Sequence, residues 1–409
     1  MMKNKLNTIE LFAGCGGLLD GFEQSGYYNT LASVEWNEKP NDVLIKRLKS
    51  KYGYQDAEQK AMRFDIQRTD ELLNGWIDDP EYGSSIGLKA ILGNRIVDLI
   101  VGGPPCQAYS LAGRIQDKDG MKNDYRNYLF ESYLKVVDAF KPKLIVFENV
   151  EGMLSAKPDG INIIDKIKQG FMGLGYELID DIRRVALLDL SEFGVPQQRK
   201  RVILVGLNKY YFGEGIQQIL YSFYNETLCN YKSKKIYNVT DAIGDLPKFF
   251  PADDEYKIKG RTYSHRPFKS NIKDHYPRYH NKRDIVIFKE LAQDIESGRN
   301  QYSNTKSLID LYTEKTGKES NIHKYNVLKW DMPSNTIPAH LKKDGLRHIH
   351  PDSSQARTIT VREAARLQTF DDDFEFSGNM SYDYEMIGNA VPPKFAKCLA
   401  TALYDFLNI

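Results

Sequence analysis

Residues 8–17 read TIELFAGCGG and join a short apolar run to three glycines. The run at 8–13 predicts a buried strand, and the apolar spacing at 18–24 predicts a helix directly after the glycines. A strand, a glycine turn and a helix in this order open a βαβ unit. The glycines of such a turn let a ligand approach the backbone at the carboxyl end of the strand. This stretch therefore predicts an α/β fold with a ligand site at its first turn.

The same alternation continues through the first half of the chain. Further strands are expected at 30–35, 96–101, 143–148 and 201–207, with helices at 39–51 and 126–140. Strands that alternate with helices favour a mostly parallel sheet with helices on both faces. From 208 to 330 the chain is rich in Tyr, Asn, Lys and Pro, which indicates a second, irregular domain. Helical spacing at 393–408 predicts that the chain then rejoins the first domain.

Bulk composition is that of a globular enzyme with room for two domains. The chain has 409 residues, of which 41% are hydrophobic and 27% charged. Residues 1–10 have no signal-peptide pattern, and no apolar run reaches the length of a membrane span. We therefore expect no membrane partner. Because Cys15, Cys106, Cys229 and Cys398 lie far apart, we expect neither a disulfide framework nor a metal site. The expected location is the cytoplasm.

The glycine turn does not have the pattern of a phosphate-binding loop. Leu19 stands where the dinucleotide motif needs its third glycine, and no Lys-Ser or Lys-Thr pair follows the glycines. Glu35 ends the next expected strand, where a carboxylate can accept hydrogen bonds from ribose hydroxyls, and Trp36 could cover an adenine. A nucleoside cofactor without a pyrophosphate, such as S-adenosylmethionine, fits this pattern. A tight turn beside a surface Glu-Trp pair fits it as well.

Two further motifs lie at the ends of expected strands, and a third precedes a strand. In VGGPPCQ (101–107) two prolines fix the backbone, which indicates that Cys106 lies on a rigid loop and is a candidate nucleophile. Glu148 ends the following strand, so its carboxylate would face the thiol. In QQRKR (197–201), strand alternation places Gln197, Arg199 and Arg201 on one face. The alternatives are a structural cysteine and an ordinary strand-terminal glutamate.

Residues 255–283 are basic and aromatic. They contain five lysines and four arginines against one glutamate and one aspartate, a net charge of +7, together with four tyrosines and three histidines. This composition is typical of a nucleic-acid surface. A solvated loop region would have a similar composition.

Taken in order, these motifs resemble those of the DNA cytosine-5-methyltransferases. FAGCGG (12–17) resembles the cofactor loop, and GGPPCQAYSLAGR (102–114) the catalytic loop, with Tyr109 where Phe is common. ENV (148–150), the Q-x-R-x-R pattern (197–201), RTITVRE (357–363), RLQ (366–368) and GNAVPP (388–393) follow in family order. The ordered set is specific, although each motif alone is weak. Only residues 208–330 lack family signatures.

The resemblance implies a Rossmann-like, S-adenosylmethionine-dependent domain and gives each motif a role. Cys106 would add to carbon 6 of cytosine, Glu148 would hold the ring N3 and amino group, Arg201 would reach the ring O2, and Arg199 would support Glu148. Asp65 would lie near the adenine amino group, and Asn389 and Val391 near the methionine part. The implied cofactor residues are Phe12, Gly14, Cys15, Gly16, Gly17, Leu18, Glu35, Trp36, Asp65, Ile66, Pro104, Asn389 and Val391.

The resemblance also implies two domains. Residues 1–207 with 378–409 would form a discontinuous catalytic and cofactor-binding domain, and 208–377 a smaller, irregular target-recognition domain whose variable part is about 208–330. The expected DNA-contacting residues are Gln107, Ser110, Lys257, Lys259, Arg261, Arg266 and Lys269.

The predicted function is sequence-specific methylation of cytosine carbon 5 in double-stranded DNA, on a base flipped out of the duplex. We expect a bacterial monomer that serves as the modification enzyme of a restriction-modification system. Its cognate endonuclease would act on the same site without forming a stable complex. One alternative is the tRNA-methylating branch of the family, which carries a Cys-Phe-Thr signature, whereas this chain has only Cys229 in that region. The other is a catalytically inactive DNA-binding relative, against which Cys106, Glu148 and Arg201 argue.

Overall fold

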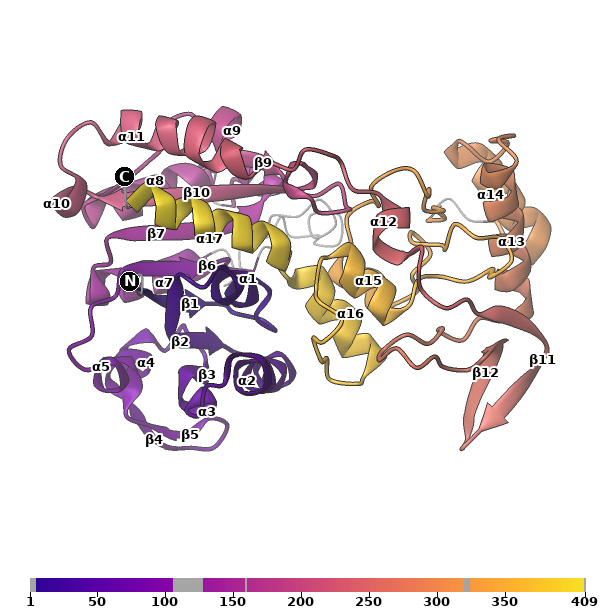
Figure 1. Ribbon diagram of the computed structural model, residues 1–409, viewed down its shortest axis with the longest axis horizontal. Helices are drawn as coiled ribbons and strands as arrows, with labels where there is room; N and C mark the ends of the chain where they lie inside the picture. The colour runs from indigo at the N-terminus through magenta and orange to yellow at the C-terminus, as the bar shows by residue number, and fades with distance from the viewer. Residues whose placement is uncertain (1–4, 106–127, 159, 320–323, 408–409) are drawn as a thin grey trace. The chain divides into compact units, whose positions relative to one another are not determined.

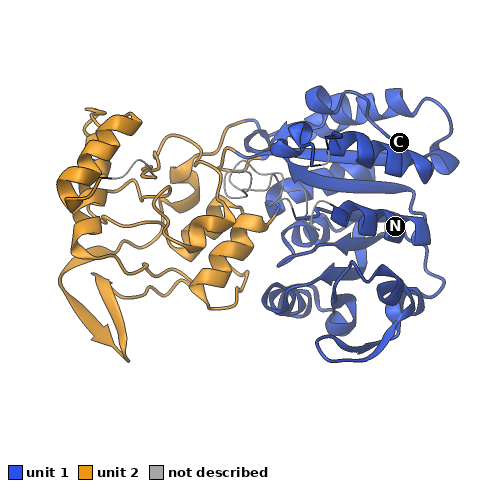
Figure 2. Cartoon of the chain, turned by 180° about the vertical axis from the view of Figure 1, so that it is seen from behind, with its two compact units in different colours: residues 1–193, 199–234, 391–409 blue, residues 194–198, 235–390 orange. Residues whose placement is uncertain are grey.

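The computed structural model describes residues 5–105, 128–158, 160–319 and 324–407. The chain divides into two compact units, drawn blue and orange in Figure 2. Unit 1 comprises Met1–Phe193, Arg199–Lys234 and Val391–Ile409. Unit 2 comprises Gly194–Gln198 and Lys235–Ala390.

An eight-stranded sheet forms the centre of unit 1 (Figure 1). Its strands are β1 (Leu6–Leu11), β2 (Tyr28–Glu35), β3 (Ala61–Arg63), β6 (Leu99–Gly102), β7 (Leu144–Val150), β8 (Tyr176–Leu178), β9 (Leu187–Asp189) and β10 (Lys200–Asn208). The order is β3-β2-β1-β6-β7-β10-β8, and β9 pairs with β10. The strands β3, β2, β1, β6 and β7 are parallel to one another. In contrast, β10 is antiparallel to β7, β8 and β9. The order reverses between β1 and β6, which is where ligands of open α/β sheets bind.

The predicted α/β class with a mostly parallel sheet is confirmed, and the strand at 30–35 lies within β2. The first strand ends at Leu11, two residues before the expected end, because Phe12 has a φ of 59° and cannot continue an extended strand. The strand expected at 96–101 begins only at Leu99.

Helices surround this sheet, and a small hairpin lies beside it (Figure 1). The helices are α1 (Gly17–Ser25), α2 (Glu38–Tyr52), α3 (Ala57–Lys60), α4 (Thr69–Asn74), α5 (Gly87–Leu92), α7 (Leu129–Phe140), α8 (Ile163–Gly173), α9 (Ile182–Val185), α10 (Lys209–Phe212), α11 (Ile216–Ser222) and α17 (Pro393–Leu407). Short turns of helix are η2 (Glu151–Ser155), η3 (Leu190–Phe193), η4 (Phe223–Thr227) and η5 (Leu228–Tyr231). The hairpin pairs β4 (Trp76–Asp79) with β5 (Gly83–Ser85).

The last helix of the chain, α17, packs against α1. A Cβ atom at Gly21 of α1 would lie 2.4 Å from the Cβ of Ala396 and 2.4 Å from the carbonyl oxygen of Pro393. Only glycine permits this close approach. Tyr28 adds a hydrogen bond of 2.8 Å from its hydroxyl to the carbonyl of Ala400. The helix predicted at 393–408 thus belongs to the same unit as the first strand.

Residues 208–234 also belong to unit 1, although the sequence predicted that the second domain begins at 208. They form α10, α11, η4 and η5; α10 contacts β10, α11 contacts β8, and η4 and η5 contact α17. The Tyr224 hydroxyl accepts a hydrogen bond from the Val205 amide at 2.9 Å and donates one to the Ile203 carbonyl at 2.7 Å. The boundary therefore lies near 234, because a buried tyrosine ties this segment to the sheet.

Unit 2 contains few regular elements. They are α12 (Val239–Ile243), the hairpin of β11 (Phe250–Ile258) and β12 (Arg261–Arg266), α13 (Lys282–Glu296), α14 (Thr305–Thr316), η6 (Ala339–Lys342), α15 (Val361–Leu367) and α16 (Met380–Asn389). One apolar cluster consists of Ile287, Phe288, Leu291, Leu311, Tyr325, Ile349 and Ala356. This agrees with the expected irregular character of the second half.

Helix α16 lies in unit 2, although residues 378–390 were expected in the first domain. The Tyr384 hydroxyl donates a 2.6 Å hydrogen bond to the Ile359 carbonyl. A Cβ atom at Gly388 would lie 2.3 Å from the backbone of Pro338 and Ala339. These contacts are internal to unit 2, so its boundary lies at Ala390.

Candidate active site

The glycine turn between β1 and α1 has the strained backbone of a ligand-binding loop. Phe12, Gly14 and Gly16 have φ angles of 59°, 57° and 87°, and an atom placed at the Cβ position of Gly14 would meet nothing within 4 Å. No side-chain hydrogen bond caps the N-terminus of α1. Positive φ at a residue other than glycine is unfavourable and is concentrated at functional sites. The loop thus presents open backbone at the carboxyl end of β1.

Of the other predicted residues in this loop, Cys15 and Leu18 have buried side chains. They can contribute backbone groups to a ligand but little side-chain surface. Gly16 and Gly17 lie at the start of α1, and Gly17 is the first residue of the helix.

Glu35 joins this loop to β2. Its Oε2 accepts a hydrogen bond from the Gly14 amide at 2.8 Å, and its Oε1 accepts one from the Asn37 amide at 2.7 Å. Burial raises the pKa of Glu35, and the hydrogen bonds from Asn37 and Gly14 act in the opposite direction. A carboxylate oxygen can accept more than one hydrogen bond, so Oε2 retains capacity for a ligand hydroxyl.

Glu10 is a second acid beneath the loop, which the sequence reasoning did not single out. It is buried in β1, and its Oε2 has no hydrogen-bond partner among the described residues. Burial, followed by the charge of Glu35, raises the pKa of Glu10 well above its usual value. Burial therefore favours the protonated form of Glu10. A single Glu in the apolar run TIELFA was the only signal of it.

Trp36, Asp65 and Ile66 lie beyond the carboxyl ends of β2 and β3. The Trp36 side chain is 45% exposed, whereas Ile66 is buried. The Asp65 carboxylate accepts a 3.0 Å hydrogen bond from the Gln67 amide. The Phe64 amide donates to the Glu35 carbonyl at 3.1 Å, which holds the ends of β2 and β3 together. Residues predicted from two separate motifs therefore share one edge of the sheet.

Glu148 lies directly against the end of β6. A Cβ atom at Gly103 would be 2.4 Å from the Glu148 Oε2, so only glycine leaves room for this carboxylate. Pro104 follows and is buried. Cys106, Gln107 and Ser110 lie outside the described residues. The segment that leads to Cys106 nevertheless starts beside Glu148.

Glu148 pairs with Arg201 across strands β7 and β10. The Arg201 Nε lies 2.9 Å from the Glu148 Oε1, and the two side chains are 12% and 13% exposed. Arg199 is buried, and burial, followed by the charge of Arg201, lowers its pKa while Glu148 opposes this. The ion pair with Arg201 fixes the direction of the Glu148 carboxylate, and the buried Arg199 adds a second positive charge that interacts with it.

Strand alternation predicted that Gln197 lies on one face with Arg199 and Arg201, but Gln197 is assigned to a different unit from the two arginines. It belongs to unit 2, where the Ile337 amide donates to its Oε1 at 2.9 Å and its Nε2 donates to the Gln368 Oε1 at 2.5 Å. β10 begins only at Lys200, so the strand alternation used for the prediction does not extend to Gln197 or Arg199. Asn389 belongs to unit 2 and Val391 to unit 1.

The RTITVRE pattern (357–363) builds the interior of unit 2. Both Glu363 oxygens pair with Arg357 at 2.7 Å, and both side chains are buried. Thr360 and Glu363 form a capping box at the start of α15. Burial lowers the pKa of His350, which lies 3.5 Å from Glu363, to about 3. These residues hold the fold of unit 2.

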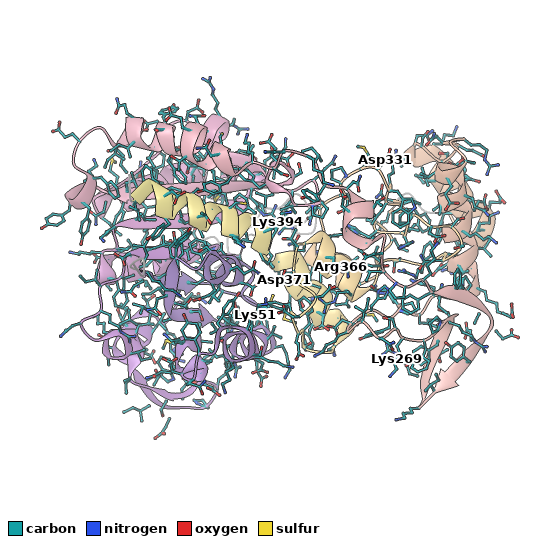
Figure 3. The ribbon with its side chains drawn as sticks, viewed as in Figure 1. Lys51, Lys269, Asp331, Arg366, Asp371 and Lys394 are labelled. Atoms are coloured by element: carbon teal, nitrogen blue, oxygen red, sulfur yellow. The ribbon has the colours of Figure 1, made fainter. Side chains whose placement is uncertain are left out.

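The β11–β12 hairpin carries the basic residues predicted to contact DNA. Lys259 and Gly260, with φ angles of 48° and 79°, form its two-residue turn between Ile258 and Arg261. The Arg261 guanidinium lies 5.6 Å from the Tyr263 ring centre. Arg266 lies 4.9 Å from the Tyr256 ring centre, and Tyr256 stacks on Tyr263. Lys269, labelled in Figure 3, follows β12.

Comparison with known proteins identifies the family of this chain. Residues 6–405 match the family described as C-5 cytosine-specific DNA methylase. The chain belongs to that family. Its enzyme class is accordingly DNA cytosine-5-methyltransferase, as its resemblance predicted.

Individual relatives are similar over nearly their whole length. The type II methyltransferase M.Bpa9945I of Bacillus paralicheniformis is 33% identical, and the alignment covers 98% of this chain and 99% of the relative. The type II methyltransferase M.DdeI of Desulfomicrobium norvegicum is 30% identical over 99% of this chain and 90% of its own. A crystal structure of a prophage-encoded E. coli protein named as a DNA modification methyltransferase has a TM-score of 0.61 at 23% identity, covering 99% and 100% of the two chains. That likeness supports the fold.

The described residues contain neither a membrane-spanning helix nor a cluster of metal ligands. None of their helices is long and apolar enough to cross a membrane. No group of three or more His, Cys, Asp or Glu side chains in that part of the chain could hold a metal ion.

Proposed function

We propose that this methyltransferase modifies carbon 5 of a flipped-out cytosine in double-stranded DNA through a covalent adduct with Cys106. The observation that carries the proposal is the Glu148–Arg201 pair beside Gly103, at the start of the segment that leads to Cys106. Carbon 5 of cytosine is a weak nucleophile. Addition of the Cys106 thiolate to carbon 6 would place electron density on carbon 5 and negative charge on the ring.

Glu148 and its arginine partners would stabilise that charge. A proton delivered to the ring N3 through Glu148 would neutralise the charge, the Glu148 carboxylate left behind would accept a hydrogen bond from the amino group, and Arg201 would reach the ring O2. Charge that develops only in the transition state is stabilised most effectively by groups that are fixed in place before the reaction. After methylation, loss of the carbon 5 proton to a base would expel Cys106 and restore the aromatic ring.

The residues around the glycine loop fit S-adenosylmethionine as the cofactor. The backbone over Gly14 is open, and Glu35 offers a fixed carboxylate oxygen for a ribose hydroxyl. Trp36 offers an exposed aromatic face for adenine. When bound, this cofactor supplies an electrophilic methyl group. Asp65, Ile66, Pro104, Asn389 and Val391 remain predicted contacts.

Transfer of a tritiated methyl group tests the reaction directly. Purified protein is incubated with labelled S-adenosylmethionine and either mixed duplex DNA or mixed tRNA, and the modified base is identified by chromatography. Label in 5-methylcytosine of DNA supports the proposal. Label confined to tRNA, or no label with a folded protein, would reject it in favour of the tRNA-methylating or inactive alternative.

Glu35→Ala is expected to weaken S-adenosylmethionine binding about tenfold to a hundredfold, because a hydrogen bond to a charged group contributes about 1.5–3 kcal/mol. Calorimetry measures the affinity, and DNA binding should be unchanged. Glu38→Ala removes an exposed carboxylate from the same region and is the matched control. Equal affinities of the Glu35→Ala and Glu38→Ala proteins would exclude Glu35 from the cofactor site.

The β11–β12 hairpin is the proposed DNA-contacting element of unit 2. Between Glu255 and Asp274 the chain has four lysines, two arginines and no acidic residue. A two-stranded ribbon fits the major groove, and the tyrosines beneath Arg261 and Arg266 hold both guanidinium groups in place. Unit 2 would thus recognise the target sequence, with lysines on the phosphates and other side chains on base edges.

Replacing Lys257 and Lys259 with glutamine should weaken binding to all DNA sequences alike. Each lost phosphate contact lowers the slope of log affinity against log salt by about 0.9. Fluorescence anisotropy at several salt concentrations measures this slope. The matched control replaces Lys89 and Lys209, two exposed lysines of unit 1. An unchanged slope in the hairpin variant would remove the hairpin from the DNA interface.

Because M.Bpa9945I and M.DdeI are named as type II methyltransferases, we propose that the enzyme is the modification half of a type II restriction-modification system. It would act as a monomer in a bacterial cytoplasm. The cognate endonuclease would recognise the same site independently.

A further inference from the structure

Asn37 occupies the N-cap position of α2, directly after the Glu35-Trp36 pair, but its side chain does not cap the helix. Its φ and ψ angles of −78° and 133° are those of an ordinary N-cap residue. Every residue of α2 is described, and none of its amides donates to the Asn37 side chain. Part of the reason is local, since Pro40, the third residue of α2, has no N–H to donate. The side chain is therefore available for another contact.

The other asparagines at described N-cap positions do cap their helices. In each case the side chain accepts a hydrogen bond from an amide of the first helical turn, which is the usual role of asparagine at this position. These residues are Asn162, Asn208, Asn238, Asn281, Asn304 and Asn379. Among the described N-cap asparagines, Asn37 thus differs in the partner of its side chain.

The partner of the Asn37 side chain is Glu35. The Asn37 Nδ2 donates a 3.1 Å hydrogen bond to the Glu35 Oε1, which also accepts the 2.7 Å bond from the Asn37 amide. The Glu35 Oε2 accepts a bond from the Gly14 amide at 2.8 Å. Because a carboxylate oxygen accepts about two hydrogen bonds, Asn37 occupies the acceptor positions of Oε1. A ligand hydroxyl would therefore approach Oε2, beside the open backbone of Gly14.

The surroundings of Glu35 otherwise oppose its negative charge. Glu35 is buried, and burial raises its pKa. Its charge also acts on the buried Glu10 of β1 and raises the pKa of that acid. The hydrogen bonds from Asn37 and Gly14 lower the pKa of Glu35, because N–H donors stabilise the ionised form. Asn37 thus supports the form of the carboxylate that accepts the strongest hydrogen bonds.

We infer that Asn37 is a positioning residue for cofactor binding: its side-chain amide fixes the Glu35 carboxylate so that Oε2 is presented to the ribose hydroxyls. The inference rests on the proposed function, in which Glu35 contacts the ribose. A carboxylate that is held in its binding orientation beforehand loses less conformational entropy when the ligand binds. Removal of the Asn37 donor should therefore weaken cofactor binding through Glu35.

Asn37→Asp tests the donor while it keeps the size of the side chain and its ability to cap a helix. Aspartate cannot donate to Glu35, so the affinity for S-adenosylmethionine, measured by calorimetry, should fall about threefold to tenfold, which corresponds to one hydrogen bond. KM for the cofactor should rise by a similar factor with kcat unchanged. The melting temperature should not fall, because aspartate and asparagine are equally good N-cap residues. A residue with only a structural role would leave affinity and KM unchanged.

Asn304→Asp, at the N-cap of α14, is the matched control. The Asn304 side chain accepts a 3.0 Å hydrogen bond from the Ser307 amide, which aspartate can also accept, so this variant should bind the cofactor as the wild type does. An Asn37→Asp protein with the affinity of the Asn304→Asp protein would overturn the inference.

A double-mutant cycle with Glu35→Ala shows whether Asn37 acts through Glu35. If it does, adding Asn37→Asp to the Glu35→Ala protein should cause no further loss of affinity. Additive losses would overturn the inference and leave the proposed function intact. A wild-type protein that did not bind S-adenosylmethionine, or a Glu35→Ala protein with full affinity, would instead reject the proposed cofactor site, and the inference with it.

Discussion

Replacing Cys106 with serine is expected to lower methyl transfer by more than about a thousandfold while DNA and cofactor affinities stay within a few-fold of the wild type. The thiolate is the attacking group in the proposed reaction, and a serine hydroxyl is far less readily ionised. Loss of one essential catalytic group commonly removes most of the rate enhancement. Tritium incorporation measures turnover, and anisotropy and calorimetry measure the two affinities.

Cys229→Ser and Cys398→Ser are the matched controls for this substitution. Both cysteines lie in unit 1 and are partly buried, and neither is part of the proposed site. Both variants should retain turnover. Substantial methylation by the Cys106→Ser protein would mean that another group attacks the base.

Glu363→Gln is expected to destabilise unit 2 by about 3–5 kcal/mol, because it leaves the Arg357 charge buried without its partner. Glutamine keeps the size of the side chain and can still serve in a capping box, so the charge is the main change. Hydrogen exchange of α15 along a urea titration measures the unfolding of this unit.

Glu314→Gln provides the comparison, since its side chain is 67% exposed. A surface substitution of this kind should change stability by less than about 0.5 kcal/mol. If the two variants unfolded at the same urea concentration, the Arg357–Glu363 pair would contribute nothing to the stability of unit 2.

The sequence predicted the parallel part of the sheet well, because buried strands such as β6 and β7 contain the continuous apolar runs LIV and LIVF. It predicted that Glu35 and Glu148 end strands on one edge, since the carboxyl ends of parallel strands lie together. It did not place Gln197, whose partners Ile337 and Gln368 are distant in sequence. Tertiary contacts of this kind leave no local pattern.

The unit boundaries could not be predicted for a related reason. The segment at 208–234 is polar and irregular in composition, yet Tyr224 joins it to β10 through two backbone hydrogen bonds.

A covalent trap tests the central claim most directly. The protein is incubated with S-adenosylmethionine and a randomised duplex pool that contains 5-fluorocytosine, and the products are separated under denaturing conditions. Fluorine at carbon 5 cannot leave as a proton, so elimination of the enzyme is blocked. The account predicts a denaturation-resistant protein–DNA adduct whose peptide map identifies Cys106. An adduct on Cys15, Cys229 or Cys398, or no adduct from protein that methylates ordinary DNA, would contradict it.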